Sequence, residues 1–218
     1  MKNIILTLRY FLLPYILLLA FFGYILSEFP KPNIHLFFNS LHHPFFDFLF
    51  KYITHIGDGL FLIPVFIFLL FIKFRSAFSV LAAYLLSSII TQTLKNTIFE
   101  GEPRPLLYFK NFDESLRLID GITMNNLNSF PSGHATSAFA LFVCLAWIVK
   151  NKFWQSTFLI LACFTAFSRV YISQHFLGDI YAGSIIGCAS AIFIIYIFEK
   201  YTASDYSHFW NKNLKLNV

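Results

Sequence analysis

The chain has 218 residues, of which 57% are hydrophobic, 20% are aromatic and only 12% are charged. An ordinary soluble domain carries about 25% charged residues, so this composition excludes a soluble monomer. The net charge of +5 is not gathered on one face but lies between hydrophobic segments, so membrane topology explains it better than a nucleic-acid partner. Apolar runs recur along almost the whole length, and we expect residues 1–218 to form a single membrane-embedded domain.

Six apolar stretches predict an all-α, polytopic helical bundle with six transmembrane helices. The first stretch follows Lys2 and Arg9, is longer than the apolar part of a signal peptide and lacks a small-residue cleavage motif. We therefore expect it to be an uncleaved anchor. The second, fourth and fifth stretches are short and should extend into polar flanks. The expected spans cover residues about 10–27, 57–73, 76–95, 133–150, 153–170 and 177–198.

Between the first two spans, residues 34–52 mix many phenylalanines with histidines and charged residues. This pattern is typical of an amphipathic helix at the membrane interface, here broken near Pro44. His42 and His43 are adjacent and would point to different faces of a helix, which argues against a metal site. The three cysteines are odd in number, lack ligand spacing and lie in apolar runs, so we expect them to serve packing: Cys144, Cys163 and Cys188.

The distribution of charge predicts the orientation of the chain. With the N-terminus inside, nine basic and two acidic residues face the cytoplasm, a net +7, whereas seven basic and nine acidic residues face outward, a net −2. This asymmetry follows the positive-inside rule and makes both termini cytoplasmic. The two long connecting segments, residues 28–58 and 95–133, then lie outside, where we expect the chemistry. The inner charges are Lys2, Arg9, Lys73, Arg75, Lys150, Lys152, Lys200, Lys212 and Lys215 with Glu199 and Asp205.

Polar residues gather in three clusters at the outer ends of the third to sixth spans. In the first cluster, Lys95 closes the third span, and Arg104 follows between Pro103 and Pro105, which stiffen the backbone around its guanidinium. Taken alone, a lysine or arginine at a membrane edge more often extends its charge to the interface or sets the topology. This cluster therefore indicates a functional site only in combination with the other two.

The second cluster is Phe130-Pro131-Ser132-Gly133-His134, immediately before the fourth span. Ser132 is a candidate helix N-cap, and Gly133 allows an incoming group to approach the backbone. The free N–H groups and positive end of the helix favour an anion there, and His134 could donate a proton to it. The alternative is an interfacial histidine beside an ordinary cap.

The third cluster reads Ser168-Arg169, then five residues to His175 and three more to Asp179. If both lie on a helix that begins the sixth span, His175 and Asp179 are one turn apart. The carboxylate can then hold one imidazole nitrogen and leave the other free as a nucleophile, although a purely structural pair is the alternative. Together the clusters supply three cations for a phosphate, one acid and one oriented imidazole on the same side of the membrane.

At these residues the chain resembles the type 2 phosphatidic acid phosphatase superfamily, whose signature reads K-x6-R-P, P-S-G-H and S-R-x5-H-x3-D. The second and third parts match without gaps. The first part departs, because eight residues instead of six separate Lys95 from Arg104, and the expected lysine position holds Thr97. Two extra residues near Gly101-Glu102 would have to loop out for Lys95 to reach the site.

The resemblance implies a membrane lipid phosphate or diphosphate phosphatase that needs neither a metal ion nor another cofactor. It implies that His175 attacks phosphorus to form a phosphohistidine, that Asp179 orients this imidazole, and that His134 protonates the leaving oxygen and later activates water. Five residues would bind the phosphoryl oxygens: Lys95, Arg104, Ser132, Gly133 and Arg169.

The implied substrate presents a phosphate at the outer surface while its apolar part stays in the bilayer. Undecaprenyl diphosphate is our first expectation; phosphatidylglycerol phosphate, phosphatidic acid and lipid A are alternatives. The loop between Pro105 and Asn128 mixes apolar and charged residues, and we expect it to help choose the head group. A phosphotransferase with the same site, a vanadate-dependent haloperoxidase and a scaffold with a decayed site are the rival functions. We expect a multi-pass protein of the bacterial inner membrane with its site facing the periplasm; the oligomeric state stays open.

Overall fold

A computed structural model of the chain describes residues 1–110, 115–202 and 209–214, and all regular structure within these ranges is helical. The loop residues 111–114, which include the outer acids Asp113 and Glu114, and two inner members of the charge count, Asp205 and Lys215, lie outside the described residues. The helices are α1 (Lys2–Thr7), α2 (Arg9–Glu28), α3 (Lys31–Ser40), α4 (Pro44–Ile53), the 3-10 turn η1 (Thr54–Gly57), α5 (Gly59–Ile72), α6 (Phe74–Thr97), α7 (Pro105–Phe109), α8 (Gly133–Val149), α9 (Lys152–Tyr171) and α10 (Leu177–Thr202).

The all-α membrane bundle is confirmed, and the six predicted spans correspond to α2, α5, α6, α8, α9 and α10. Among the described residues, α2, α6, α9 and α10 are long and apolar enough to cross a membrane alone. The segment 44–57 and α5 meet at a bend of 60° and would add a fifth span if counted together. Helix α8 has 17 residues and is about 26 Å long at 1.5 Å per residue, short of the ~30 Å hydrocarbon layer. The count of six spans therefore stays a prediction.

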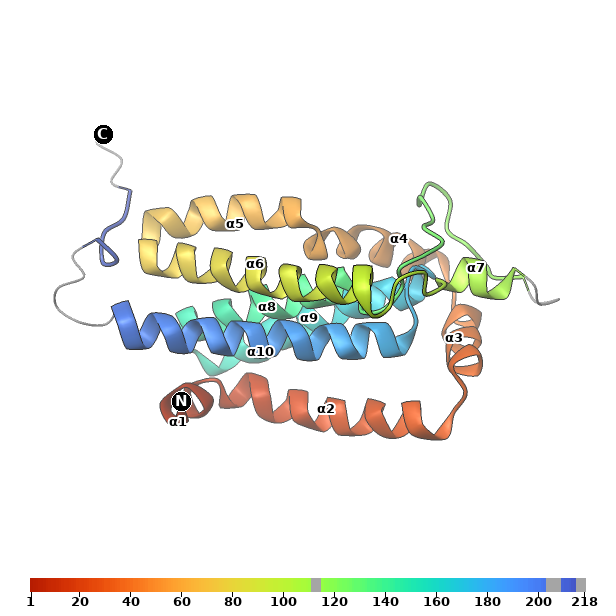
Figure 1. Cartoon of the computed structure of the whole chain (residues 1–218), viewed down its shortest axis with the longest axis horizontal. Helices are drawn as coiled ribbons and strands as arrows, with labels where there is room; N and C mark the ends of the chain where they lie inside the picture. Colours follow the sequence, from red (N-terminus) through yellow and green to blue (C-terminus); the bar gives the residue numbers. More distant parts are fainter. Residues whose placement is uncertain (111–114, 203–208, 215–218) are drawn as a thin grey trace.

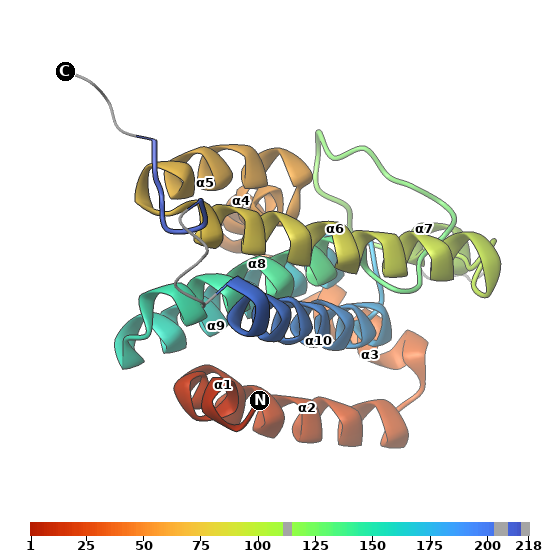
Figure 2. The same ribbon diagram turned by 60° about the vertical axis from the view of Figure 1, so that its left-hand side comes forward.

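Helix α8 lies at the centre of the bundle and packs against α10, α9 and α6 (Figures 1 and 2). Two glycines of α10 allow its close contact with α8. A Cβ added at Gly187 would lie 2.3 Å from the carbonyl oxygen of Thr136, and one at Gly183 would lie 2.6 Å from that of Ser132. Small residues at membrane helix contacts let backbones approach in this way. The start of α8 is thereby held against the start of α10, where the second and third sequence clusters end.

The two ends of the bundle differ. Helix α1 and the C-terminal half of α10 lie at one end, whereas α3 and α7 lie at the other (Figure 1). The placement of both termini on the cytoplasmic side of the membrane stays a prediction. The cysteines Cys144 and Cys188 are buried, Cys163 is partly buried, and all three are free.

The segment between the first two spans is broken near Pro44 as predicted, into α3 and α4, but two of the histidines within residues 34–52 are buried, whereas His43 is exposed. His35 and His42 are 1% and 8% exposed, because both pack inside the protein. The ring of His42 stacks on that of Tyr171 with centroids 4.4 Å apart, and Asp47 lies 3.2 Å from its Nδ1 atom. The interfacial interpretation is therefore wrong for His35 and His42. The rings of Phe109 and Phe176 pack against His35, and that of Tyr171 packs against His42.

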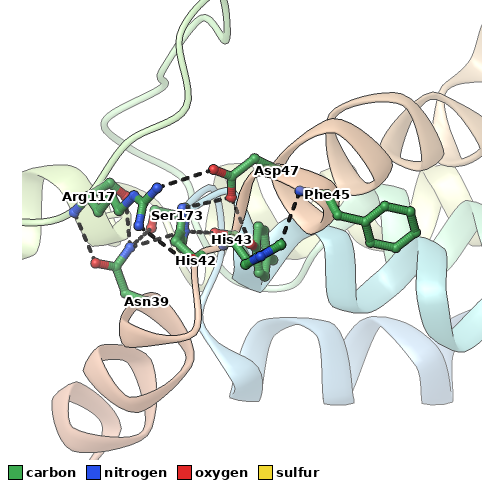
Figure 3. Close-up of polar contacts among 8 residues, drawn as sticks. Asn39, His42, His43, Phe45, Asp47, Arg117 and Ser173 are labelled. Carbon is green, nitrogen blue, oxygen red and sulfur yellow. Dashed lines mark hydrogen bonds and ion pairs between the residues drawn. The ribbon is translucent and has the colours of Figure 1, made fainter.

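The polar residues around His42 and Asp47 also contact the long outer loop, at Arg117 (Figure 3). The Asn39 side chain donates to the carbonyl oxygen of Arg117 at 2.8 Å and accepts from the backbone N–H of Arg117 at 2.9 Å. It also donates to the hydroxyl of Ser173 at 3.2 Å, two residues before His175. Helix α3 thus connects the long outer loop with the turn that carries the candidate nucleophile.

Candidate active site

The three predicted clusters meet around one cavity of about 510 Å³ at the end of the bundle where α6 runs out toward α7 (Figure 1). Six predicted site residues line it, and the other two, Ser132 and Asp179, contact residues that do. The packing of α8 against α10 brings the second and third clusters together. Lys95, near the end of α6, and Arg104, in the outer loop, bring the first cluster to the same cavity. The lining residues are Gln92, Lys95, Arg104, Asn125–Asn128, Gly133, His134, Arg169 and His175.

His175 and Asp179 form a pair, but not on one helix as the sequence suggested. Helix α10 begins at Leu177, so His175 lies in the preceding turn. The carboxylate of Asp179, in the first turn of α10, accepts from the backbone N–H of Phe176 at 2.9 Å and from the hydroxyl of Ser129. The same carboxylate oxygen lies 3.3 Å from Nδ1 of His175. Because Nδ1 is held, Nε2 is the nitrogen left for chemistry.

The environment of His175 keeps its imidazole neutral. The side chain is 1% exposed, and burial lowers its pKa to about 3, although the Asp179 carboxylate acts in the opposite direction. A neutral imidazole retains the lone pair that a nucleophile needs at ordinary pH.

Three cations border the cavity. Nη1 of Arg169 donates to the Thr54 hydroxyl at 2.7 Å, while its Nε is buried without a hydrogen-bond partner. Nη1 of Arg104 donates to Oε1 of Gln174 at 3.0 Å. Buried N–H groups are nearly always hydrogen-bonded, so the open donor of Arg169 fits a role in binding an anion. Burial lowers the pKa of Arg104, which leaves a guanidinium that is poorly hydrated and ready to pair with such an anion.

Lys95 reaches the cavity despite the unusual spacing. Its Nζ atom donates to the carbonyl oxygen of Asn128 at 2.6 Å, and the side chain is buried. The chain turns at residues 98–101, and Gly101 adopts a positive φ of 77° with open space around the position of a Cβ. The extra residues thus lie in an exposed turn, as the sequence required for Lys95 to approach Arg104.

The second cluster forms the N-terminus of α8. Ser132 is the N-cap, and its hydroxyl accepts from the backbone N–H of Ala135 at 3.4 Å. A Cβ at Gly133 would have nothing within 4 Å, so packing does not explain this glycine. The open space at Gly133 lets a bound group approach the first turn of the helix.

His134 has a partner that sequence reasoning missed. Its Nε2 atom lies 2.6 Å from Oδ1 of Asp58, which precedes α5 and belongs to none of the three clusters. Thr54 and Ser129 were missed as well, since each acts only through a contact made by the fold. For Asp58 the sequence does contain a signal, because glycines flank it on both sides at the start of a span.

A membrane helical bundle with an oriented neutral imidazole, an opposed histidine and three cations around one cavity has the fold and site of an integral membrane phosphohydrolase. Residues 76–203 match the family model described as "PAP2 superfamily", and the chain belongs to this superfamily. It is a membrane lipid phosphate phosphatase.

Named relatives and solved structures agree with this family. The chain is 28% identical to "Lipid A 4'-phosphatase" of Bacteroides thetaiotaomicron over 176 residues, 77% of this chain and 76% of the relative. It is also 28% identical to the protein of that name from Porphyromonas gingivalis over 175 residues, 77% and 73% of the two chains. The crystal structure of Aquifex aeolicus LpxE is similar with a TM-score of 0.68 and 23% identity, covering 78% of this chain and 98% of that one. The PAP2 type phosphatidylglycerolphosphate phosphatase of Bacillus subtilis gives a TM-score of 0.61 and 21% identity over 89% and 97%. At these identities the solved structures show the fold alone.

Proposed function

We propose that the protein removes a phosphate group from a saccharolipid of the lipid A type through a phosphohistidine on His175. The cavity that gathers His175, His134 and three cations is the observation that carries this proposal. Each of its parts has a place in phosphoryl transfer from a lipid.

In the first step, Nε2 of His175 attacks phosphorus while the bond between phosphorus and the leaving oxygen breaks. His134 gives its proton to that oxygen, so the lipid leaves as an alcohol. Asp179 stabilises the positive charge on the phosphorylated imidazole through Nδ1. Lys95, Arg104 and Arg169 neutralise the phosphoryl oxygens as their charge is redistributed in the transition state.

In the second step, water attacks phosphorus and the phosphorus–nitrogen bond breaks. His134, now neutral, accepts a proton from the water as it attacks, and inorganic phosphate is released. His175 returns to its neutral form, which its burial favours. The enzyme is thereby restored after two proton transfers through the same histidine.

The lining of the cavity supports a hydroxyl-rich leaving group. Gln92, Asn125, Asn126 and Asn128 line the cavity and carry side-chain amides that can bond to sugar hydroxyls. The two relatives named lipid A 4'-phosphatase support the same substrate class. Undecaprenyl diphosphate, which the layout of the sequence favours, is the second candidate. We also propose that the loop of residues 105–128 helps choose the head group, although its residues 111–114 lie outside the described part of the chain.

We propose further that the whole chain forms one domain of a bacterial inner membrane, with six spans and the cavity facing the periplasm. The charge asymmetry of +7 against −2 supports this orientation. A single cysteine placed at Gly101, in the exposed turn beside the cavity, should react with an impermeant maleimide in intact spheroplasts. Reaction only after lysis would reverse the orientation.

The test of the reaction is phosphate release from detergent-solubilised lipid A, undecaprenyl diphosphate, phosphatidylglycerol phosphate and phosphatidic acid, with EDTA present. We expect the fastest release from lipid A, and no release by His175→Ala. His43→Asn is the matched control, because it lies outside the cavity and keeps an acceptor for the α4 cap. Release at the wild-type rate by His175→Ala would refute the mechanism, and preference for undecaprenyl diphosphate would refute the substrate. Transfer of phosphate to an added lipid alcohol in place of water would identify a phosphotransferase.

A further inference from the structure

Asp58 lies outside the three motifs, at the 60° bend between η1 and α5. Its Oδ1 atom is 2.6 Å from Nε2 of His134, and its Oδ2 atom is 2.8 Å from Nδ1 of His55. The His55 side chain is 67% exposed, whereas that of His134 is 26% exposed. The inner contact of Asp58 is therefore with a histidine of the cavity.

The backbone on both sides of Asp58 is closely packed against its neighbours. A Cβ at Gly57 would lie 3.0 Å from both Cβ and the carbonyl oxygen of His134. A Cβ at Gly59 would lie 2.5 Å from the hydroxyl oxygen of Tyr84. The sequence Gly57-Asp58-Gly59 thus allows the bend to sit directly against the start of α8, which brings the carboxylate to His134.

The carboxylate does not perform the usual task of an aspartate in its position. Asp58 is the N-cap residue of α5, yet its side chain accepts no hydrogen bond from the backbone of that helix. An aspartate cap commonly stabilises a helix, so this contribution is given up. The side chain instead turns to His134, which indicates that the contact with the imidazole is the one the structure favours.

We propose that Asp58 is a positioning residue that holds His134 in the orientation and protonation state needed to protonate the leaving group. This inference rests on the proposed role of His134. With Nε2–H directed at Asp58, Nδ1–H is the proton passed to the leaving oxygen, and His134 keeps its bond to Asp58 when it becomes neutral. Nδ1 later accepts the proton of the attacking water. The site then contains two aspartate–histidine pairs, Asp179 with the nucleophile and Asp58 with the acid.

The charges around the cavity explain why His134 needs a carboxylate partner such as Asp58. Arg104 and Arg169 line the same cavity as His134, and their positive charges disfavour protonation of its imidazole. A carboxylate at 2.6 Å offsets that repulsion and stabilises the imidazolium that must donate the proton.

The position of Asp58 also keeps its negative charge away from the phosphate. Asp58 does not line the cavity of about 510 Å³ but a second one of about 170 Å³, and His134 lines both. The imidazole thus separates the carboxylate from the bound anion. Asp58 acts through His134 and does not touch the substrate.

The experiment compares two leaving groups in Asp58→Asn, His134→Ala and the double variant. The substrates are the preferred lipid phosphate, whose alcohol needs a proton to leave, and 4-nitrophenyl phosphate, whose phenolate does not. We expect Asp58→Asn to lower kcat for the lipid by about 10²-fold or more, with KM nearly unchanged, and to lower kcat for the aryl ester by less than about tenfold. The double variant should lose no more than His134→Ala alone. Glu199→Gln is the matched control, because Glu199 forms an ion pair of the same 2.6 Å length with Arg75 at the other end of α6.

Equal losses on both substrates, or wild-type turnover of the lipid by Asp58→Asn while His134→Ala is impaired, would overturn the assignment of Asp58 alone. If His134→Ala itself shows no dependence on the leaving group, the proposed role of His134 fails and the inference falls with it. Should Asp58→Asn not fold, Asp58→Ser removes the carboxylate but retains an N-cap oxygen, and the same comparison applies.

Discussion

Replacing Asp179 by asparagine tests how the nucleophile is held. The carboxylate accepts hydrogen bonds from the Phe176 N–H and the Ser129 hydroxyl and faces Nδ1 of His175. All three contacts are made by the same oxygen, Oδ2. An asparagine that places its own oxygen there keeps the contacts but lacks the negative charge that stabilises the phosphorylated imidazole. An asparagine that places its NH₂ group there loses the first two bonds and donates to Nδ1, which moves the imidazole proton to Nε2, so that the nitrogen that should attack phosphorus loses its lone pair.

The size of the effect follows from the bonds lost. A hydrogen bond to a charged group contributes about 1.5–3 kcal/mol, which corresponds to about 10- to 150-fold in rate. The wrong tautomer adds to this loss, and the same substitution in a Ser-His-Asp triad lowers kcat about 10⁴-fold. We therefore expect Asp179→Asn to lower kcat by at least about 100-fold with little change in KM.

Steady-state phosphate release in detergent measures this loss, and a thermal melt shows whether the variant remains folded. A folded Asp179→Asn that turns over within about fivefold of the wild type would refute the assignment of Nε2 as the nucleophile and of Asp179 as its holder.

Three further predictions use other parts of the molecule. Gly133→Ala should fold as stably as the wild type, because its Cβ meets nothing within 4 Å, but should lose activity as the methyl group enters the phosphate site; Gly187→Ala should instead lower the melting temperature, since its Cβ would lie 2.3 Å from a carbonyl oxygen. Lys95→Met should raise KM and lower kcat in phosphate-release assays, and unchanged kinetics would remove Lys95 from the site. Burial lowers the pKa of His35 from its ordinary value of about 6.5 to about 4, so the unfolded chain binds more protons between these pH values, and folding stability falls as the pH drops through that window. At pH 5 this one group costs about 2 kcal/mol, and the melting temperature of His35→Asn should decline less between pH 7 and pH 5 than that of the wild type.

The helices could be predicted because long apolar runs in this chain have few alternatives to a membrane helix. The predicted ranges for the third and sixth spans differ from α6 and α10 by a few residues at the ends. The predicted second span, residues 57–73, also differs from α5 by one or two residues at each end. The 60° bend at Asp58 could not be predicted, since it depends on the packing of Gly57 against α8. The burial of His35 and His42 depends likewise on rings from distant parts of the chain, such as Phe109 and Tyr171.

The candidate site was accessible from sequence wherever a residue belongs to a contiguous motif. The residues of the second and third clusters meet around the cavity, and so does Lys95, whose spacing is irregular. The helical placement of His175 was wrong, because the carboxylate of Asp179 bonds to the N–H of Phe176 and α10 begins only at Leu177. Asp58 was missed because its partner lies 76 positions away in the chain, and such a pairing is visible only after folding.

The bonds between Asn39 and Arg117 bear on how the protein recognises its substrate. A loop of this length would normally sample many conformations, and ordering it at the moment of binding would weaken affinity. Here the Asn39 side chain imitates the paired N–H and C=O of a neighbouring strand and fixes the loop backbone at Arg117, while Lys51 donates to the carbonyl oxygen of Asp120 at 2.6 Å. Residues 115–128 are therefore ordered when the protein folds. In the proposed reaction, residues 125–128 would meet the head group already in place, and selectivity among lipids would become a property of a rigid rim.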